Sequence, residues 1–169
     1  MPSRAPDFDQ FVSENADALL RTAYLIVFDL PEAEDLVQET LFKVARRWPK
    51  VRRMDHPAAY ARRILVNAAI DGATKRARRR AELAADEPPE LATPTQDERD
   101  DDLHQALAAL PPRQRAVLVL RYFLDLPEAE VAAALDCSLG TVKSTASRAL
   151  ARLELAMRPT HDSPRSLAS

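Results

Sequence analysis

The sequence of 169 residues contains only two glycines, and its aromatic residues are limited to one tryptophan, three tyrosines and five phenylalanines. A β-rich fold needs many turns and many β-branched or aromatic positions, so this composition disfavours a sheet protein. Alanine, leucine, arginine and glutamate are abundant instead, and these residues are good helix formers. The composition therefore predicts an all-α protein.

Cysteine and histidine are also scarce. Cys137 is the single cysteine, so no internal disulfide can form, and the three histidines are scattered along the chain. A structural zinc site needs a cluster of such ligands. The sequence shows no nucleophile-base pair and no phosphate-binding loop either. We therefore expect no metal, no cofactor and no catalytic site.

Long apolar runs are missing as well. No run approaches the roughly 18 residues that a membrane-spanning helix needs. The first ten residues are acidic and lack the apolar core of a signal peptide. We therefore expect a cytoplasmic protein without membrane insertion.

Charge is unevenly distributed along the chain, although the formal net charge is only −2. Residues 46–80 hold twelve lysines and arginines against two acids, a net charge of +10. Residues 82–102 hold nine acids against one arginine, a net charge of −8. A basic block followed by an acidic one suggests a domain that binds a polyanion and a tether that avoids it.

The acidic segment also contains three prolines and only two large apolar residues, Leu83 and Leu91. Such a composition is typical of a flexible, extended linker. We therefore expect two small helical domains joined by this acidic linker. The expected divisions are a first domain at residues 7–80, the linker at 81–102, a second domain at 103–157 and a disordered tail at 158–169.

Three amphipathic helices are expected in the first domain, from the spacing of its apolar residues. The first covers residues 8–27. The second runs from Pro31 to Pro49 with Trp48 on its apolar stripe, and the third covers residues 57–80. Together they predict a small bundle whose last helix ends in a basic tail.

The second domain contains a short helix from Pro127 to Leu135, a tight connection at residues 136–138, and a longer helix from Leu139 to about Met157. This order is typical of a helix-turn-helix, in which the second helix enters the major groove of DNA. Ser138 is a good N-cap residue for that helix. Asp136 stands where glycine is usual, and aspartate tolerates the left-handed backbone conformation better than most residues.

The longer helix has two distinct faces at 100° per residue. Lys143 and Arg148 flank a face of small residues and suit phosphates or guanine edges. An ordinary helical hairpin with a solvated face would share this pattern, so both interpretations stay open. The apolar face holds Leu139, Val142, Ala146, Ala149, Leu150 and Leu153, and the small face holds Gly140, Ser144, Ser147 and Ala151.

The basic tail from Lys75 to Arg80 also has two interpretations. Positive charge is favoured at the C-terminal end of any helix, where it needs no ligand. The density of charge, together with Arg62 and Arg63 upstream, favours contact with DNA phosphates.

Three segments resemble the extracytoplasmic-function (ECF) group of bacterial sigma factors, the subunits that direct RNA polymerase to promoters. In that family the segments bind the polymerase, read the −10 promoter element and read the −35 element, respectively. They occur here in the family's order, and the likeness spans about residues 8–157. The segments are AEDLVQET at 33–40, RRILVNAAID at 62–71 followed by KRARRR, and LPPRQR at 110–115 with GTVKS at 140–144 and SRAL at 147–150.

The resemblance implies core RNA polymerase and promoter DNA as partners, with an anti-sigma factor as a further candidate, and it implies no catalysed reaction. It also implies that Asn67 and the loop at residues 52–57 hold an unstacked base of the opened −10 strand. Polymerase contact would use Asp35, Gln38, Glu39 and Lys43. The −10 contact would use Tyr60, Arg62, Arg63, Asn67, Lys75, Arg76, Arg78, Arg79 and Arg80. The −35 contact would use Thr141, Lys143, Ser144, Ser147 and Arg148.

Two positions depart from the family's pattern. Thr145 follows the Lys-Ser pair where many members have arginine, and Tyr60 stands where tryptophan is frequent. The chief alternative function is a free-standing transcriptional regulator that binds operator DNA through the same helix-turn-helix. That alternative leaves the basic first domain and its acidic polar helix unexplained.

Overall fold

The computed structural model describes residues 7–84 and 98–159. Every regular element in these residues is a helix, so the prediction of an all-α fold is confirmed. The N-terminal half consists of α1 (Phe8–Val27), α2 (Leu30–Arg46), α3 (Trp48–Val51) and α4 (Pro57–Ala84). The C-terminal half consists of α5 (Glu98–Ala109), α6 (Pro112–Leu118), the π-helix η1 (Val119–Phe123), α7 (Glu128–Leu135) and α8 (Leu139–Met157).

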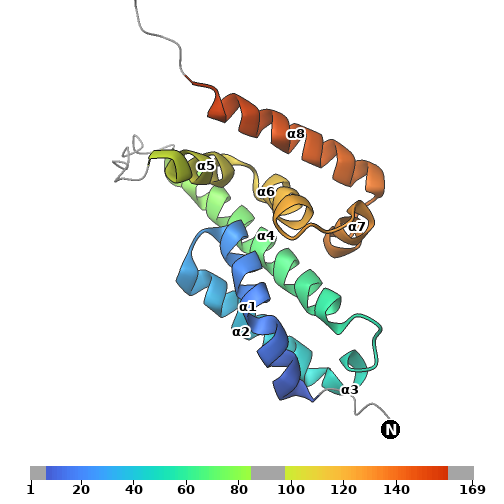
Figure 1. The fold of residues 1–169 in the computed structure, drawn as a ribbon. Coiled ribbons are helices and arrows are strands. Elements are labelled where there is room, and N and C mark those ends of the chain that lie inside the picture. The colour runs from blue at the N-terminus through green and yellow to red at the C-terminus, as the bar shows by residue number, and fades with distance from the viewer. Residues whose placement is uncertain (1–6, 85–97, 160–169) are drawn as a thin grey trace, which may run out of the picture.

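Aspartate caps begin the first two helices. The Asp7 carboxylate accepts a hydrogen bond from the backbone N–H of Gln10 at 2.8 Å and starts α1. Asp29 accepts one from the backbone N–H of Glu32 at 2.9 Å and starts α2, with Pro31 in the first turn. α1, α2 and α4 then pack side by side (Figure 1). Their fully buried side chains include Ile26, Val44 and Leu65.

The second helix ends earlier than predicted. α2 stops at Arg46, and Trp48 opens the short helix α3 instead of extending the apolar stripe of α2. Pro49 lies in the first turn of α3, where a missing N–H leaves no hydrogen bond unmade. The Trp48 ring lies 5.5 Å from the Phe8 ring and 5.2 Å from the Phe11 ring, centroid to centroid. α3 therefore anchors the chain before α4 on the start of α1.

Helices extend into both ends of the segment predicted to be an extended linker. α4 continues to Ala84 and α5 begins at Glu98, so residues 81–84 and 98–102 are helical. The reason for the first extension is that alanine, glutamate and leucine at 81–84 are good helix formers and no proline occurs before Pro88. The rest of the predicted linker, and residues 160–169 of the predicted tail, lie outside the described residues.

The two halves pack against each other, which the sequence pattern did not predict. α4 lies along α6 and α7 (Figure 1), and α1 contacts η1. Buried residues of both halves form one continuous hydrophobic cluster that includes Leu65 of α4, Leu120 of η1 and Val131 of α7. A smaller cluster joins α5 and α8 through Leu107 and Ala149. One side of α4 is therefore turned toward the helix-turn-helix.

Candidate nucleic-acid and polymerase interfaces

α2 exposes a polar stripe opposite its buried side. Glu39 Oε1 and Lys43 Nζ form an ion pair at 3.0 Å, one helical turn apart. Both side chains are at least half exposed, so the pair stabilises α2 only slightly and remains accessible to a partner. All four residues predicted to bind polymerase are exposed, namely Asp35, Gln38, Glu39 and Lys43.

Phe42 extends this stripe, and the sequence analysis missed it. Its side chain is 63% exposed, and it lies one helical turn beyond Gln38 and Glu39. The guanidinium carbon of Arg46 lies 6.0 Å from the centre of its ring. An exposed aromatic ring among charged side chains is typical of a protein-protein contact. The signal in the sequence is an aromatic residue at a position that the helical period places on the polar face.

α7, the connection at residues 136–138 and α8 form the helix-turn-helix that the sequence predicted. Asp136 adopts the left-handed conformation, with φ 54° and ψ 49°, and its backbone N–H donates to the carbonyl oxygen of Ala132. Ser138 Oγ accepts a hydrogen bond from the backbone N–H of Thr141 at 3.1 Å. Both predicted roles are confirmed, and together these two polar residues make the turn without glycine.

α8 exposes the small-residue face that was predicted to approach DNA. Arg148 is held beside it, because its guanidinium donates to the backbone oxygen of Ser144 at 3.3 Å and to Ser144 Oγ at 3.4 Å. Lys143 Nζ lies 3.8 Å from Glu128 Oε2 of α7. Exposed residues of this face and its flanks are Gly140, Thr141, Lys143, Ser144, Ser147, Arg148 and Ala151.

The apolar side of α8 is narrower than predicted. Leu139 is 48% exposed and Leu150 is 41% exposed, whereas Thr145 is buried. The buried arc is centred near Ala149, and at 100° per residue Leu139 and Leu150 lie about 80° and 100° away from it. Thr145 lies on the inner side of the arc, so it packs into the C-terminal half and offers no contact to a DNA backbone.

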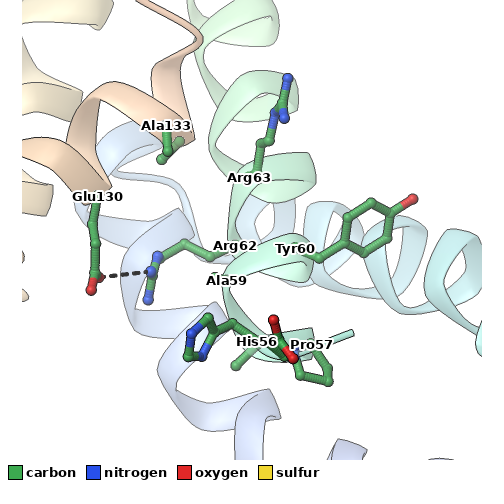
Figure 2. A pocket seen from close by; sticks show the side chains of 11 residues that line it. His56, Pro57, Ala59, Tyr60, Arg62, Arg63, Glu130 and Ala133 are labelled. Atoms are coloured by element: carbon green, nitrogen blue, oxygen red, sulfur yellow. Dashed lines mark ion pairs between the residues drawn. The ribbon is translucent and has the colours of Figure 1, made fainter. Parts of the chain in front are cut away.

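The predicted −10 arginines at the start of α4 are engaged by the helix-turn-helix. Arg62 Nη2 lies 3.6 Å from Glu130 Oε2 of α7, as Figure 2 shows. Arg63 Nη2 lies 3.5 Å from Asp136 Oδ1 in the turn. Arg62 Nε is buried and has no hydrogen-bond partner among the described residues. Two carboxylates of the C-terminal half therefore pair with the two arginines that were predicted to contact DNA phosphates.

Asn67 lies one helical turn beyond Arg63 on α4. Its side-chain amide donates to the backbone oxygen of Arg63 at 2.7 Å and to the backbone oxygen of Ala134 in α7 at 3.0 Å. An amide nitrogen carries two N–H donors, so both are used. Only the amide oxygen of Asn67 is left for recognition of a base in this arrangement.

A cavity of about 650 Å³ lies beside these residues (Figure 2). Its two sides are formed by α7 and by the segment that leads into α4. Asp55, His56 and Tyr60 line one side, and Glu130 lines the other. The Tyr60 hydroxyl accepts a long hydrogen bond of 3.5 Å from Arg47 Nη1. The cavity includes part of the loop that the resemblance assigns to base capture, but α7 forms one of its walls.

The basic tail of α4 divides into two parts. Arg76 is half-buried and forms an ion pair with Glu32 of α2. Burial lowers the pKa of Arg76, the positive charge of Arg80 lowers it further, and the carboxylate of Asp29 opposes both. Arg76 thus helps to hold α4 on α2. The tail residues exposed to solvent are Lys75, Arg78, Arg79 and Arg80.

Metal ligands do not cluster in residues 7–84 and 98–159, where no group of three or more histidine, cysteine, aspartate or glutamate side chains could hold an ion. In the same part of the chain, no helix is long and apolar enough to cross a membrane. Cys137 is a free cysteine, partly buried in the turn.

Two family models match the chain, one for each half. They are sigma-70 region 2, over residues 11–79, and sigma-70 region 4, over residues 100–153. The chain is 39% identical over 150 residues to the RNA polymerase sigma-E factor of Streptomyces coelicolor. The alignment covers 87% of this chain and 84% of that protein. It is 30% identical over 141 residues to the RNA polymerase sigma factor SigV of Bacillus subtilis, covering 82% and 84% of the two chains.

Among solved structures, the chain is similar to the sigma factor RpoE of Bartonella quintana, which was solved in complex with the anti-sigma factor NepR. The TM-score is 0.68 at 27% sequence identity, and the match covers 89% of this chain and 96% of that one. The region 2 match includes the polar stripe of α2 and most of the basic helix α4, and the region 4 match includes most of the helix-turn-helix. The chain belongs to the ECF group of bacterial RNA polymerase sigma factors.

Proposed function

We propose that this sigma factor docks on core RNA polymerase through the exposed stripe of α2, meets the −10 element with α4 and reads the −35 element with α8. Phe42 joins the four predicted polar residues of the stripe as its apolar contact. In this role the chain directs the polymerase to promoters and assists DNA opening. It supplies binding surfaces and positions the DNA, and RNA synthesis belongs to the polymerase.

The observation that carries the proposal is the exposed face of α8. Glycine and serine leave the helix backbone accessible on this face, so it can approach base edges in a major groove about 12 Å wide. Lys143 and Arg148 stand at its flanks, where phosphates would lie. Ser144 and Ser147 offer hydroxyl groups that can donate to or accept from base edges.

The −10 contact requires the C-terminal half to move away from α4. Arg62, Arg63 and Asn67 are held by α7 and by the turn, at distances between 3.0 and 3.6 Å. DNA that entered this face would have to displace those groups. We therefore take the described arrangement as a closed state of the free chain. The two halves separate when the chain docks on polymerase.

This function implies a location and a further class of partner. The chain would work in the cytoplasm, where the transcription machinery acts. Because the similar RpoE chain was solved with an anti-sigma factor, we include such an inhibitor among the proposed partners. It would act by favouring the closed state.

A free-standing operator-binding regulator is not favoured. Such a protein would use the helix-turn-helix alone. The match to sigma-70 region 2 over residues 11–79 and the exposed polar stripe of α2 have no role in it.

Run-off transcription with core polymerase on a library of random promoter templates tests the proposal. Adding the protein should produce discrete transcripts that core enzyme alone does not make. Charge reversal at Asp35 and Glu39 should abolish both these transcripts and binding to core enzyme, while the circular dichroism spectrum stays unchanged. Glu14→Lys combined with Asp17→Lys, at two exposed positions on α1, is the matched control and should retain both. Failure of the wild-type chain to bind core enzyme would refute the assignment.

A further inference from the structure

A second cavity, of about 540 Å³, lies between the two halves toward the other end of α4. α4 contributes Arg76 and Arg80 to its wall, and α6 contributes Arg115. Asp29 is the single acidic residue among the described residues that line it. Arg76 is nine residues beyond Asn67, about 14 Å along the helix at 1.5 Å per residue. The cavity is therefore separate from the one beside Arg62 and Asn67, although Arg76 and Arg80 also belong to the predicted −10 set.

Arg115 is buried, and no carboxylate of the described residues pairs with it. The residue is only 6% exposed. Nη1 donates to three backbone oxygens at the end of α5, those of Leu107 at 3.3 Å, Ala108 at 2.8 Å and Leu110 at 3.4 Å. Nε is buried and has no partner among the described residues. A charged guanidinium that is buried with only backbone partners favours a counter-charge close by.

The surroundings of Arg115 carry excess positive charge. Burial lowers the pKa of Arg115 to about 10, and the charges of Arg76 and Arg80 lower it as well. Two acids of the described residues offset part of this charge, since Glu32 pairs with Arg76, and Asp29, which caps α2, raises the pKa of Arg76. Arg115 stays protonated at neutral pH, so an anion in the cavity would relieve the repulsion among the three guanidinium groups.

We propose that this cavity binds a small phosphorylated ligand, with Arg80 and Arg115 as its cationic contacts and Arg76 beside them. The volume lies in the range of small-molecule sites, roughly 300–1,000 Å³. Guanidinium groups bind phosphate through charge-assisted and often bidentate hydrogen bonds. Because α4 forms one wall and α5 with α6 forms the other, the bound phosphate lies between the halves. The proposal goes beyond the sigma-factor function and does not depend on polymerase or promoter binding.

Isothermal titration calorimetry of the full chain with pyrophosphate tests the site, at constant ionic strength and with sulfate as a comparison anion. Arg80→Gln should weaken pyrophosphate binding by at least about tenfold, because it removes one charge-assisted contact. Arg80 is exposed, so this variant should fold, and its circular dichroism melt checks that it does. Arg79→Gln removes the same charge from the neighbouring position, which does not line the cavity, and it should leave the affinity unchanged.

Two results would overturn the proposal. One is the absence of pyrophosphate binding to the wild-type chain. The other is equal weakening by Arg80→Gln and Arg79→Gln, which would mean that pyrophosphate responds only to the overall charge of the basic tail. A short oligothymidylate provides a further arm. If the oligonucleotide binds through Arg80 and pyrophosphate does not, the cavity is a nucleic-acid backbone contact and the small-ligand assignment fails.

Discussion

Neutralising Glu130 and Asp136 should release the −10 face of α4. The perturbation is Glu130→Gln combined with Asp136→Asn, which keeps the size of both side chains and removes the two charges opposite Arg62 and Arg63. Asparagine tolerates the left-handed backbone conformation as aspartate does, so the turn at position 136 should be retained. The expected result is a closed arrangement that opens more easily.

The magnitude follows from the exposure of the two ion pairs. Their N–O distances are 3.6 and 3.5 Å, and the acidic side chains are 55% and 81% exposed. Exposed pairs contribute about 0.2–1 kcal/mol each, so losing both should destabilise the closed arrangement by about 0.4–2 kcal/mol. Since 1.4 kcal/mol corresponds to tenfold, the opening equilibrium constant should rise about twofold to thirtyfold. The bond from Asn67 to Ala134 and the shared apolar cluster remain, so the halves should still associate.

Fluorescence anisotropy with labelled single-stranded DNA of random sequence measures this release without polymerase. The affinity of the double variant should rise by up to the same factor. Its net charge also rises by two, which tightens any binding to DNA. The matched control is therefore Glu14→Gln combined with Asp17→Asn, two exposed acids of α1 that pair with neither Arg62 nor Arg63. An equal gain in the control, or no gain in the double variant, refutes the reasoning.

Three further substitutions test single features of the structure. Phe42→Ser should weaken binding to core enzyme severalfold in a pull-down assay, yet change the free energy of unfolding by less than about 0.5 kcal/mol, because the ring is mostly in solvent. Ser138→Ala should lower the free energy of unfolding by about 1 kcal/mol in a urea titration, because it removes the cap on Thr141. Phe28→Ala should lower it by roughly 2–3 kcal/mol, because that ring lies 5.5 Å from the Arg115 guanidinium carbon and 4.1 Å from the His104 ring. A loss below about 0.5 kcal/mol would show that Phe28 does not couple the halves.

The helix-turn-helix could be predicted from the sequence because its signals are local. Ser138 specifies the start of α8 through a bond to a residue three positions away, and Asp136 suits the left-handed turn by its own side chain. The exposed stripe of α2 follows in the same way from the helical period. Phe42 was missed because an aromatic residue is ordinarily assigned to a buried face.

The packing of the two halves could not be predicted in this way. Asn67 and Ala134 are 67 positions apart, and neither residue type indicates a partner. In the sequence, Arg62 and Glu130 are indistinguishable from the charged residues of a solvated helix surface. Only the fold places their side chains 3.6 Å apart. Arg115 was assigned to a family motif, and its burial against the carbonyl oxygens at the end of α5 depends on the turn at Pro111 and Pro112. These features depend on tertiary contacts, which a single sequence does not encode locally.

Because α4 and α7 belong to one polypeptide, the group that competes with DNA for Asn67 is present at a fixed local concentration. Dilution or overproduction of the protein leaves that competition unchanged. A cell that makes more copies of the chain therefore does not, by that alone, make a larger fraction of them ready for DNA. For the unaltered chain under constant conditions, the fraction shifts only when another molecule binds the open and closed arrangements with different affinity.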